Sequence, residues 1–180
     1  MIRKIILATI FIANVTNTLF AQKLKPAKII PGAERLEIYL PMLQGKAVAV
    51  FANQTSMVAN THLVDTLLKS GINVVKIFGP EHGFRGTADA GEHVNDGKDK
   101  KTGLPIISLY GDHKKPTKDD LKNVDVVIFD IQDVGVRFYT YISSLEYLME
   151  ACAENAKQLD RKSTRLNSSH RNTSRMPSSA

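Results

Sequence analysis

The sequence predicts an α/β fold with a Rossmann-like, doubly wound and mostly parallel sheet. Short apolar runs alternate with amphipathic stretches over residues 22–160, which is the pattern of βαβ units. The runs at 47–51 (AVAVF) and 124–129 (VDVVIF) hold almost no polar residues, as strands buried on both faces of a sheet require. We expect further strands at 72–78 and 106–110. A sheet of this class usually has one or two strands more, so we expect the domain to be truncated.

Three amphipathic stretches predict helices. Residues 61–70 carry Leu and Val at helical spacing and are followed by Gly71, a common helix stop. Residues 117–120 (TKDD) resemble a capping box that opens a short helix to Asn123. The last helix is expected from about 140 to 158. Spacings of three and four place Ile142, Leu145, Met149, Cys152 and Ala156 on one of its faces. Cys152 is the only cysteine, so we expect no intrachain disulfide and a small core residue.

The first residues predict export from the cytoplasm. Arg3 and Lys4 precede an apolar run over residues 5–13, and the small residue Ala21 follows, which is the pattern of a secretory signal peptide. The run is shorter than the roughly 20 apolar residues that cross a bilayer. We expect cleavage after Ala21, no stable membrane span, and a periplasmic or extracellular protein.

The last twenty residues are unlike the rest of the chain. Residues 161–180 hold six Ser, four Arg and no acid, a composition that cannot bury enough surface to fold. They resemble a translated adapter sequence, so we expect a disordered sequencing artefact. The expected organisation is a signal peptide at 1–21, a lead-in at 22–46, an incomplete Rossmann-like domain at 47–160, and this tail.

The net charge of +6 comes from the two ends of the chain. Of the 24 Lys and Arg, two lie in the signal peptide and five in the tail, which leaves 17 against 18 Asp and Glu. The basic excess is therefore terminal and forms no patch on the folded part. We expect no nucleic-acid partner.

Polar groups follow three of the four expected strands. Ligands of open α/β sheets bind beyond the carboxyl ends of the strands, so these groups are expected to converge there. Residues 79–103 also form a polar, Gly-rich stretch that is long for a connection in a compact domain, and such loops are usually functional. The groups are Asn53 and Gln54 after the first strand, the segments 80–86 (PEHGFRG) and 90–93 (AGEH) after the second, and Asp130, Gln132, Asp133 and Arg137 after the fourth.

Five ordered motifs carry a resemblance to a known family. They are NQT at 53–55, PEHGFRG at 80–86, AGE at 90–92, SLYG at 108–111 and FDIQDVGVRFYTY at 129–141. In this order they resemble the exo-β-N-acetylmuramidase (NamZ) family, over residues 34 to about 158. The resemblance implies a Rossmann-like N-terminal domain and a second, C-terminal domain that is missing here. It also implies a glycoside hydrolase that removes terminal β-1,4-linked N-acetylmuramic acid from peptidoglycan fragments in cell-wall turnover, without a cofactor. The chain itself is expected to be inactive.

Two glutamates on the long loop are the candidate catalytic residues. Glycoside hydrolysis usually needs one carboxyl group to protonate the leaving oxygen and a second group that assists from the other face of the sugar. Glu81 follows the second strand directly, and Glu92 follows two small residues that leave room for a sugar ring. The sequence does not distinguish which is the general acid. The second role can also fall to Asp130, to Asp133 or to the acetamido group of the substrate, so retention and inversion both stay open.

The other polar residues are candidates for substrate binding. N-acetylmuramic acid carries a lactyl carboxylate, which Arg85 or Arg137 can bind through a planar guanidinium; an ion pair of Arg137 with Asp130 or Asp133 is the structural alternative. Tyr139 and Tyr141 can stack on a sugar or simply pack at the start of a helix. Asn53 and Gln54 can bind amides or cap a turn. His82 and Gln132 complete the expected binding set.

Two other classes of function use the same positions. A metal-dependent hydrolase would use His82, His93, Asp130 and Asp133, although no zincin helix and no cysteine cluster is present in the sequence. A non-catalytic periplasmic glycan-binding module would use the same crevice. Sensitivity to chelators separates the first from a glycosidase, and sugar binding without turnover separates the second.

Overall fold

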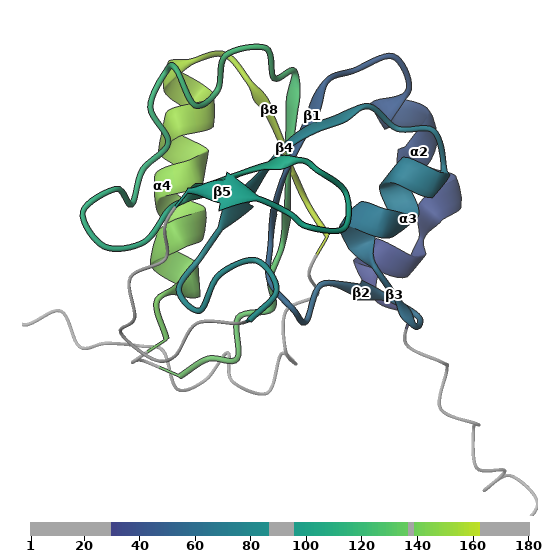
Figure 1. Cartoon of the computed structure of the whole chain (residues 1–180), viewed down its shortest axis with the longest axis horizontal. Coiled ribbons are helices and arrows are strands. Elements are labelled where there is room, and N and C mark those ends of the chain that lie inside the picture. The colour runs from purple at the N-terminus through teal and green to yellow at the C-terminus, as the bar shows by residue number, and fades with distance from the viewer. Residues whose placement is uncertain (1–29, 87–95, 137–138, 163–180) are drawn as a thin grey trace, which may run out of the picture.

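A computed structural model describes residues 30–86, 96–136 and 139–162 (Figure 1). These residues form a six-stranded mixed sheet between two layers of helices, and a separate two-stranded hairpin. The elements are η1 (Gly32–Glu34), α2 (Leu36–Leu43), β1 (Val48–Ala52), β2 (Met57–Val58), β3 (Thr61–His62), α3 (Leu63–Lys69), β4 (Val74–Gly79), β5 (Gly97–Lys98), β6 (Pro105–Ser108), β7 (Val126–Asp130), α4 (Tyr141–Glu154) and β8 (Gln158–Arg161).

The sheet has six strands in the order β5-β6-β4-β1-β7-β8. All neighbours pair in parallel except β5, which runs antiparallel to β6 at one edge. Counted along the chain, the parallel strands lie in the order 3-2-1-4-5, which is that of the Rossmann fold. The predicted fold class is therefore confirmed. From β1 the chain adds strands first on one side of the sheet and then on the other, so the switch point where such folds bind ligands lies between β1 and β7.

The two central strands are buried on both faces, as their composition predicts. All five residues of β1 and all five of β7 are buried. Alternation along β1 sends Val48 and Val50 toward α2 and α3 and sends Phe51 toward α4, so the helices cover opposite faces of the sheet (Figure 1). On the α4 face, Phe51 stacks on Phe129 of β7 with ring centroids 5.0 Å apart. This pair joins the two strands that border the switch point.

The short helix predicted over 117–123 does not form. Its capping box does form: the Thr117 backbone N–H donates to Oδ2 of Asp120 (2.7 Å), and the Asp120 N–H donates to Oγ1 of Thr117 (3.2 Å). Only turns follow, and Asn123 has a positive φ of 58°. Only three residues separate the capping box from the chain that leads into β7. They form too few hydrogen bonds to offset the free-energy cost of helix nucleation.

The last predicted helix is shorter than expected, and its buried face is different. It ends at Glu154, and Ala156, which we expected on the buried face, lies beyond it with a φ of 50°. Ile142 and Met149 are about half exposed, at 49% and 56%. The buried face consists of Leu145, Leu148, Ala151 and Cys152. The prediction for Cys152 is confirmed, and burial raises the pKa of its thiol to about 11.

One parallel strand was not predicted. β8 runs parallel to β7 and pairs Asp160 with Ile128 and Arg161 with Phe129. It includes Arg161, and Lys162 beyond it is buried, so the fold extends past the predicted boundary at 160. The short β5 was likewise unexpected within the long loop. With β5 and β8 the sheet has six strands, two more than the four that the sequence predicted.

The signal peptide predicted at 1–21 and residues 163–180 of the predicted tail lie outside the described residues. Within the described ranges, no helix is long and apolar enough to cross a membrane. The predicted lead-in at 22–46 carries η1 and α2, whose Tyr39 and Leu43 are buried against the sheet.

Candidate active site

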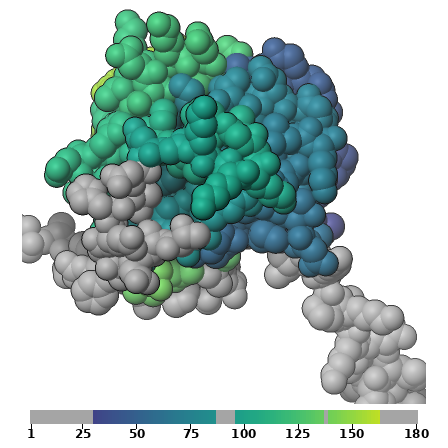
Figure 2. All heavy atoms as spheres, viewed as in Figure 1, coloured from purple at the N-terminus to yellow at the C-terminus, as the bar shows by residue number. Residues whose placement is uncertain are grey.

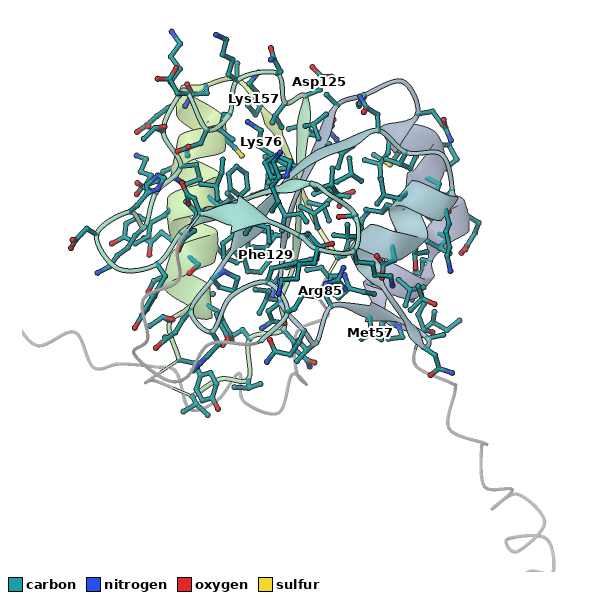
Figure 3. The ribbon with its side chains drawn as sticks, viewed as in Figure 1. Met57, Lys76, Arg85, Asp125, Phe129 and Lys157 are labelled. Carbon is teal, nitrogen blue, oxygen red and sulfur yellow. The ribbon has the colours of Figure 1, made fainter. Side chains whose placement is uncertain are left out.

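The carboxyl ends of β1, β4, β6 and β7 lie along one edge of the sheet, because these strands are parallel neighbours. Figure 3 shows Arg85 and Met57, which follow β4 and β1, at this edge, and Asp125 and Lys157 at the opposite one. The polar residues that follow the strands are thus gathered at one end of the domain, as the sequence predicts.

Glu81 is held between two hydroxyl groups at this edge. It follows β4 by two residues, and its Oε1 accepts a hydrogen bond from the Tyr110 hydroxyl (3.0 Å). Its Oε2 accepts one from Oγ1 of Thr140 (3.3 Å). Tyr110 lies two residues beyond β6, and Thr140 directly precedes α4. Three segments far apart in the chain therefore fix one carboxylate.

Tyr141 and Asn53 extend this cluster to the end of β1. The Asn53 side chain is buried and lies beside the Tyr141 hydroxyl. Oδ1 of Asn53 accepts hydrogen bonds from the backbone N–H and the hydroxyl of Thr55. Burial raises the pKa of the Tyr141 phenol, and the negative charge of Glu81 adds to that effect. We call Asn53, Glu81, Tyr110, Thr140 and Tyr141 the Glu81 cluster.

Hydrogen bonds through Ser56 and His62 hold the end of β1 at the switch point. Oγ of Ser56 accepts from the Asn53 backbone N–H (3.1 Å) and donates to the backbone carbonyl of Asp130, the last residue of β7. Nε2 of His62 lies 2.9 Å from the Asn53 carbonyl oxygen, and its Nδ1 accepts from the Val64 N–H (3.3 Å) at the start of α3. Burial lowers the pKa of His62. A neutral ring that donates through Nε2 satisfies both contacts, so His62 orients the backbone and is not free to move protons.

Asp130 points away from the Glu81 cluster. Alternation along β7 puts it on the same face as Ile128, which is the face that α2 covers. Burial raises the pKa of Asp130 to about 6, and the positive charge of Lys162 opposes the rise. Its charge also adds to the burial that raises the pKa of Tyr39 in α2. The structure does not bring Asp130 together with Glu81, as a second catalytic role for Asp130 would require.

We predict that Asp130→Asn stabilises the protein at neutral pH. The pKa in the folded chain, about 6, is above the ordinary value of 3.8, so ionisation costs more when folded and stability falls as the pH rises through about 6. A shift of this size corresponds to roughly 2–3 kcal/mol. In urea unfolding, the variant should exceed the parent by up to that amount at pH 8 and match it near pH 4. The exposed Asp119→Asn is the control. A variant that is no more stable than the parent at pH 8 contradicts a raised pKa of Asp130 in the folded chain.

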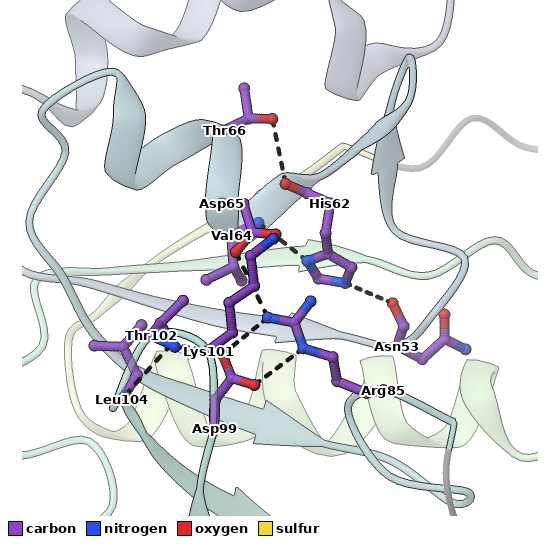
Figure 4. Close-up of polar contacts among 10 residues, drawn as sticks. All are labelled: Asn53, His62, Val64, Asp65, Thr66, Arg85, Asp99, Lys101, Thr102 and Leu104. Atoms are coloured by element: carbon purple, nitrogen blue, oxygen red, sulfur yellow. Dashed lines mark hydrogen bonds and ion pairs between the residues drawn. The ribbon is translucent and has the colours of Figure 1, made fainter.

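Arg85 is occupied by an ion-pair network (Figure 4). Its Nε and Nη2 donate to the two carboxylate oxygens of Asp99 at 3.0 and 2.8 Å, and Nη2 lies 3.5 Å from Asp65. Lys101 donates to the other oxygen of Asp65 (2.6 Å). The pKa of Asp99 is held at about 2, chiefly by the hydrogen bonds from Arg85. The guanidinium fork expected to bind a substrate carboxylate is therefore engaged by a protein carboxylate.

The remaining predicted binding residues lie around this edge. Gln54 is exposed, and its side chain covers Gly86, where an added Cβ would come within 2.6 Å of Gln54 Cδ. His82 is half-buried, with a positive φ of 68°. Gln132 is exposed, and Oδ1 of Asp133 accepts from the Gly135 N–H (3.1 Å). Tyr139 is 52% exposed, with its ring 6.1 Å from that of Tyr141.

Three of the predicted residues lie outside the described residues. They are Glu92, His93 and Arg137. Their roles therefore stay predictions. In the part of the chain that is described, no group of three or more His, Cys, Asp and Glu side chains is arranged to hold a metal ion.

Two members of the Glu81 cluster, Tyr110 and Thr140, were not predicted as site residues. Tyr110 was placed inside a strand over 106–110, but β6 ends at Ser108, so Tyr110 lies beyond a carboxyl end, where ligand groups are expected. Thr140 was treated only as the start of a helix. Had the third strand been predicted to end at Ser108, Tyr110 would have been among the candidate site residues. Nothing in the sequence around Thr140 indicates that it contacts Glu81.

The fold and these motifs agree with what is known of one family. The model of the family described as "Exo-beta-N-acetylmuramidase NamZ, N-terminal" matches residues 48–164. The chain belongs to this family. Its NamZ-type region includes β1 to β8 and every residue of the Glu81 cluster.

Relatives of known name and structure support the NamZ assignment. The chain is 48% identical over 139 residues to a protein of Bacillus subtilis (strain 168) named peptidoglycan beta-N-acetylmuramidase NamZ. Two crystal structures of DUF1343 family proteins from Bacteroides fragilis NCTC 9343 match with TM-scores of 0.66 and 0.63, at 41% and 47% identity. The matches cover 73–74% of this chain. The chain spans about one third of the length of these relatives, at 33–34%.

Proposed function

We propose that this chain serves in a glycoside hydrolase that releases terminal β-1,4-linked N-acetylmuramic acid from peptidoglycan fragments. The observation that carries the proposal is the Glu81 carboxylate, held by Tyr110 and Thr140 at the ligand-binding edge of a NamZ-family domain. The name of the Bacillus subtilis relative, a peptidoglycan beta-N-acetylmuramidase, supports the substrate and the reaction. Hydrolysis without a cofactor fits a site built from carboxyl, hydroxyl and amide groups.

The geometry supports a charged role for Glu81. Two hydroxyl groups donate to its oxygens, which suits a carboxylate that stabilises positive charge on the sugar or activates water. Glu92 then supplies the proton to the leaving oxygen, the role that the sequence left open between these two residues. The Tyr141 hydroxyl and the Asn53 amide lie beside Glu81 and can bind the acetamido group of the sugar.

We further propose that the protein works outside the cytoplasm. The basic start, short apolar run and small-residue exit over residues 1–21 support a cleaved signal peptide. Peptidoglycan lies in the same compartment. Cleavage after Ala21 is checked by the N-terminal sequence of the mature protein.

Hydrolysis by a chimera tests the proposed function. The matched region of this chain replaces the corresponding region of the Bacillus subtilis relative, which supplies the two thirds of length that this chain does not span. A disaccharide with N-acetylmuramic acid at the non-reducing end is the substrate, and the released sugars are separated and quantified. The chimera should release N-acetylmuramic acid. A folded chimera that binds the disaccharide without cleaving it identifies a glycan-binding module instead, and loss of activity with a chelator identifies a metal hydrolase.

A further inference from the structure

A polar cavity lies on the α3 side of the same edge, next to the end of β1. Its volume is about 360 Å³, and the β2–β3 hairpin, α3, Arg85 and Lys101 line it. Figure 2 shows the segment 96–104 packed against α3, in keeping with the contact between Lys101 and Asp65. The function proposed above does not use this cavity.

The acidic and basic groups of the cavity differ in exposure. The side chains of Asp65 and Asp99 are 6% and 4% exposed, so both acids are buried beneath the surface. The side chains of Arg85 and Lys101 are 30% and 65% exposed, and Lys69 on the cavity wall is exposed as well. Three positively charged side chains are therefore exposed to solvent at the cavity. The carboxylates that balance the charge of two of them are buried.

Two of the three cations, Arg85 and Lys101, are held in place before any ligand arrives. Asp99 fixes the Arg85 guanidinium through two hydrogen bonds, and the Arg85 group also lies 4.7 Å from the centre of the Phe84 ring. Asp65 fixes Lys101 at 2.6 Å. Preorganised charges bind an anion without the entropy cost of ordering long side chains. Asn60 and Thr61, also on the wall, add neutral hydrogen-bonding groups suited to sugar hydroxyls.

We propose that this cavity binds the carboxylate of an acidic sugar. The inference rests on the proposed function, under which that carboxylate is the lactyl group of N-acetylmuramic acid. Lys69 and Lys101 contact the carboxylate, and Arg85 contributes positive charge while it stays bound to Asp99. Arg85 follows Glu81 by four residues, which limits their Cα separation to about 14 Å. A glycan of a few sugar units can therefore contact both sites.

Two sugars that differ only in the lactyl ether test the inference. The affinities of the 180-residue chain for N-acetylmuramic acid and N-acetylglucosamine are measured by isothermal titration calorimetry or by NMR shifts. N-acetylmuramic acid should bind more tightly, by about tenfold, as one charge-assisted hydrogen bond provides. Lys69→Met and Lys101→Met should each weaken its binding by about 3- to 10-fold and leave N-acetylglucosamine unaffected. Lys122→Met, an exposed lysine before β7, is the matched control and should change neither affinity.

The outcomes separate this inference from the proposed function. Equal affinities for the two sugars, no binding of N-acetylmuramic acid at millimolar concentrations, or lysine variants that behave like the control each overturn the inference. The chimera can still hydrolyse muramyl glycans in those cases, and the proposed function then stands. The opposite outcome is a chimera that hydrolyses nothing while the chain still prefers N-acetylmuramic acid in a lysine-dependent way. The carboxylate site is then supported, and the proposed enzymatic function is contradicted.

Discussion

Glu81→Gln should lower the turnover of muramyl glycans by the chimera by about 10²- to 10⁴-fold, the range that a positioned acid or base contributes. Glutamine has the same shape as glutamate, and its carbonyl can still accept a hydrogen bond from Tyr110. The fold and substrate binding should therefore survive while the charge is lost. The measurement is kcat for release of N-acetylmuramic acid, with KM and urea unfolding recorded for the same variant.

Two further variants make the Glu81 prediction specific. Tyr110→Phe removes one hydrogen bond but keeps the carboxylate, so its kcat should fall between those of the parent and Glu81→Gln. Glu146→Gln changes an exposed glutamate of α4 and should leave kcat unchanged. A decrease of less than about tenfold for a folded Glu81→Gln protein would exclude Glu81 as a reacting group.

Arg85→Met should lower the free energy of unfolding by about 3–5 kcal/mol, the usual result of leaving buried charges without their partner. The almost completely buried Asp99 depends on this guanidinium through two hydrogen bonds, and the equally buried Asp65 lies 3.5 Å from it and also binds Lys101. The pKa of Asp99, about 2 when folded, is below its ordinary value of 3.8. Its contribution is therefore present above about pH 4 and is lost as the pH falls through about 2. The difference between parent and variant should accordingly shrink on acidification.

An exposed ion pair provides the control for Arg85. Lys115 contacts Glu150 and Glu154 of α4, whose side chains are 51% and 62% exposed. Lys115→Met should cost less than about 1 kcal/mol, as exposed pairs usually do. Combining Arg85→Met with Asp99→Asn should recover part of the loss, because one stranded charge is removed. Urea unfolding of the four proteins at pH 7 and pH 3 measures these effects. A loss of under 1 kcal/mol for Arg85→Met contradicts the network's role.

The central strands could be predicted because burial alone determines their composition. β1 and β7 are apolar at nearly every position since both faces are covered by helices. β8 could not be predicted in this way. Its sequence, QLDR, has one apolar residue, and it joins the sheet through backbone hydrogen bonds to β7 at an edge, where side-chain pattern carries little information.

The polar site was predicted in its location and only partly in its partners. The rule that ligands bind beyond strand ends placed Asn53 and Glu81 at one edge, and in the structure both lie there. The rule does not say which way a side chain points. Asp130 ends a strand as expected, but the alternation along β7 turns it toward α2.

Arg85 shows why a motif does not reveal the partners of its members. Asp99 lies fourteen residues later in a polar loop, and Asp65 lies on a helix that precedes the motif. Only the folded chain brings the three together. Glu92 and Arg137, from the same motifs, stay predictions.

The most direct test of the proposed function is to determine which end of a glycan the chimera cleaves. Two tetrasaccharides are compared, one with N-acetylmuramic acid and one with N-acetylglucosamine at the non-reducing end, and the first sugar released is identified by mass spectrometry. Free N-acetylmuramic acid should be released from the first, and the second should not be cleaved. Cleavage of the second glycan, or of internal bonds in both, would contradict assignment of this site to the removal of terminal N-acetylmuramic acid.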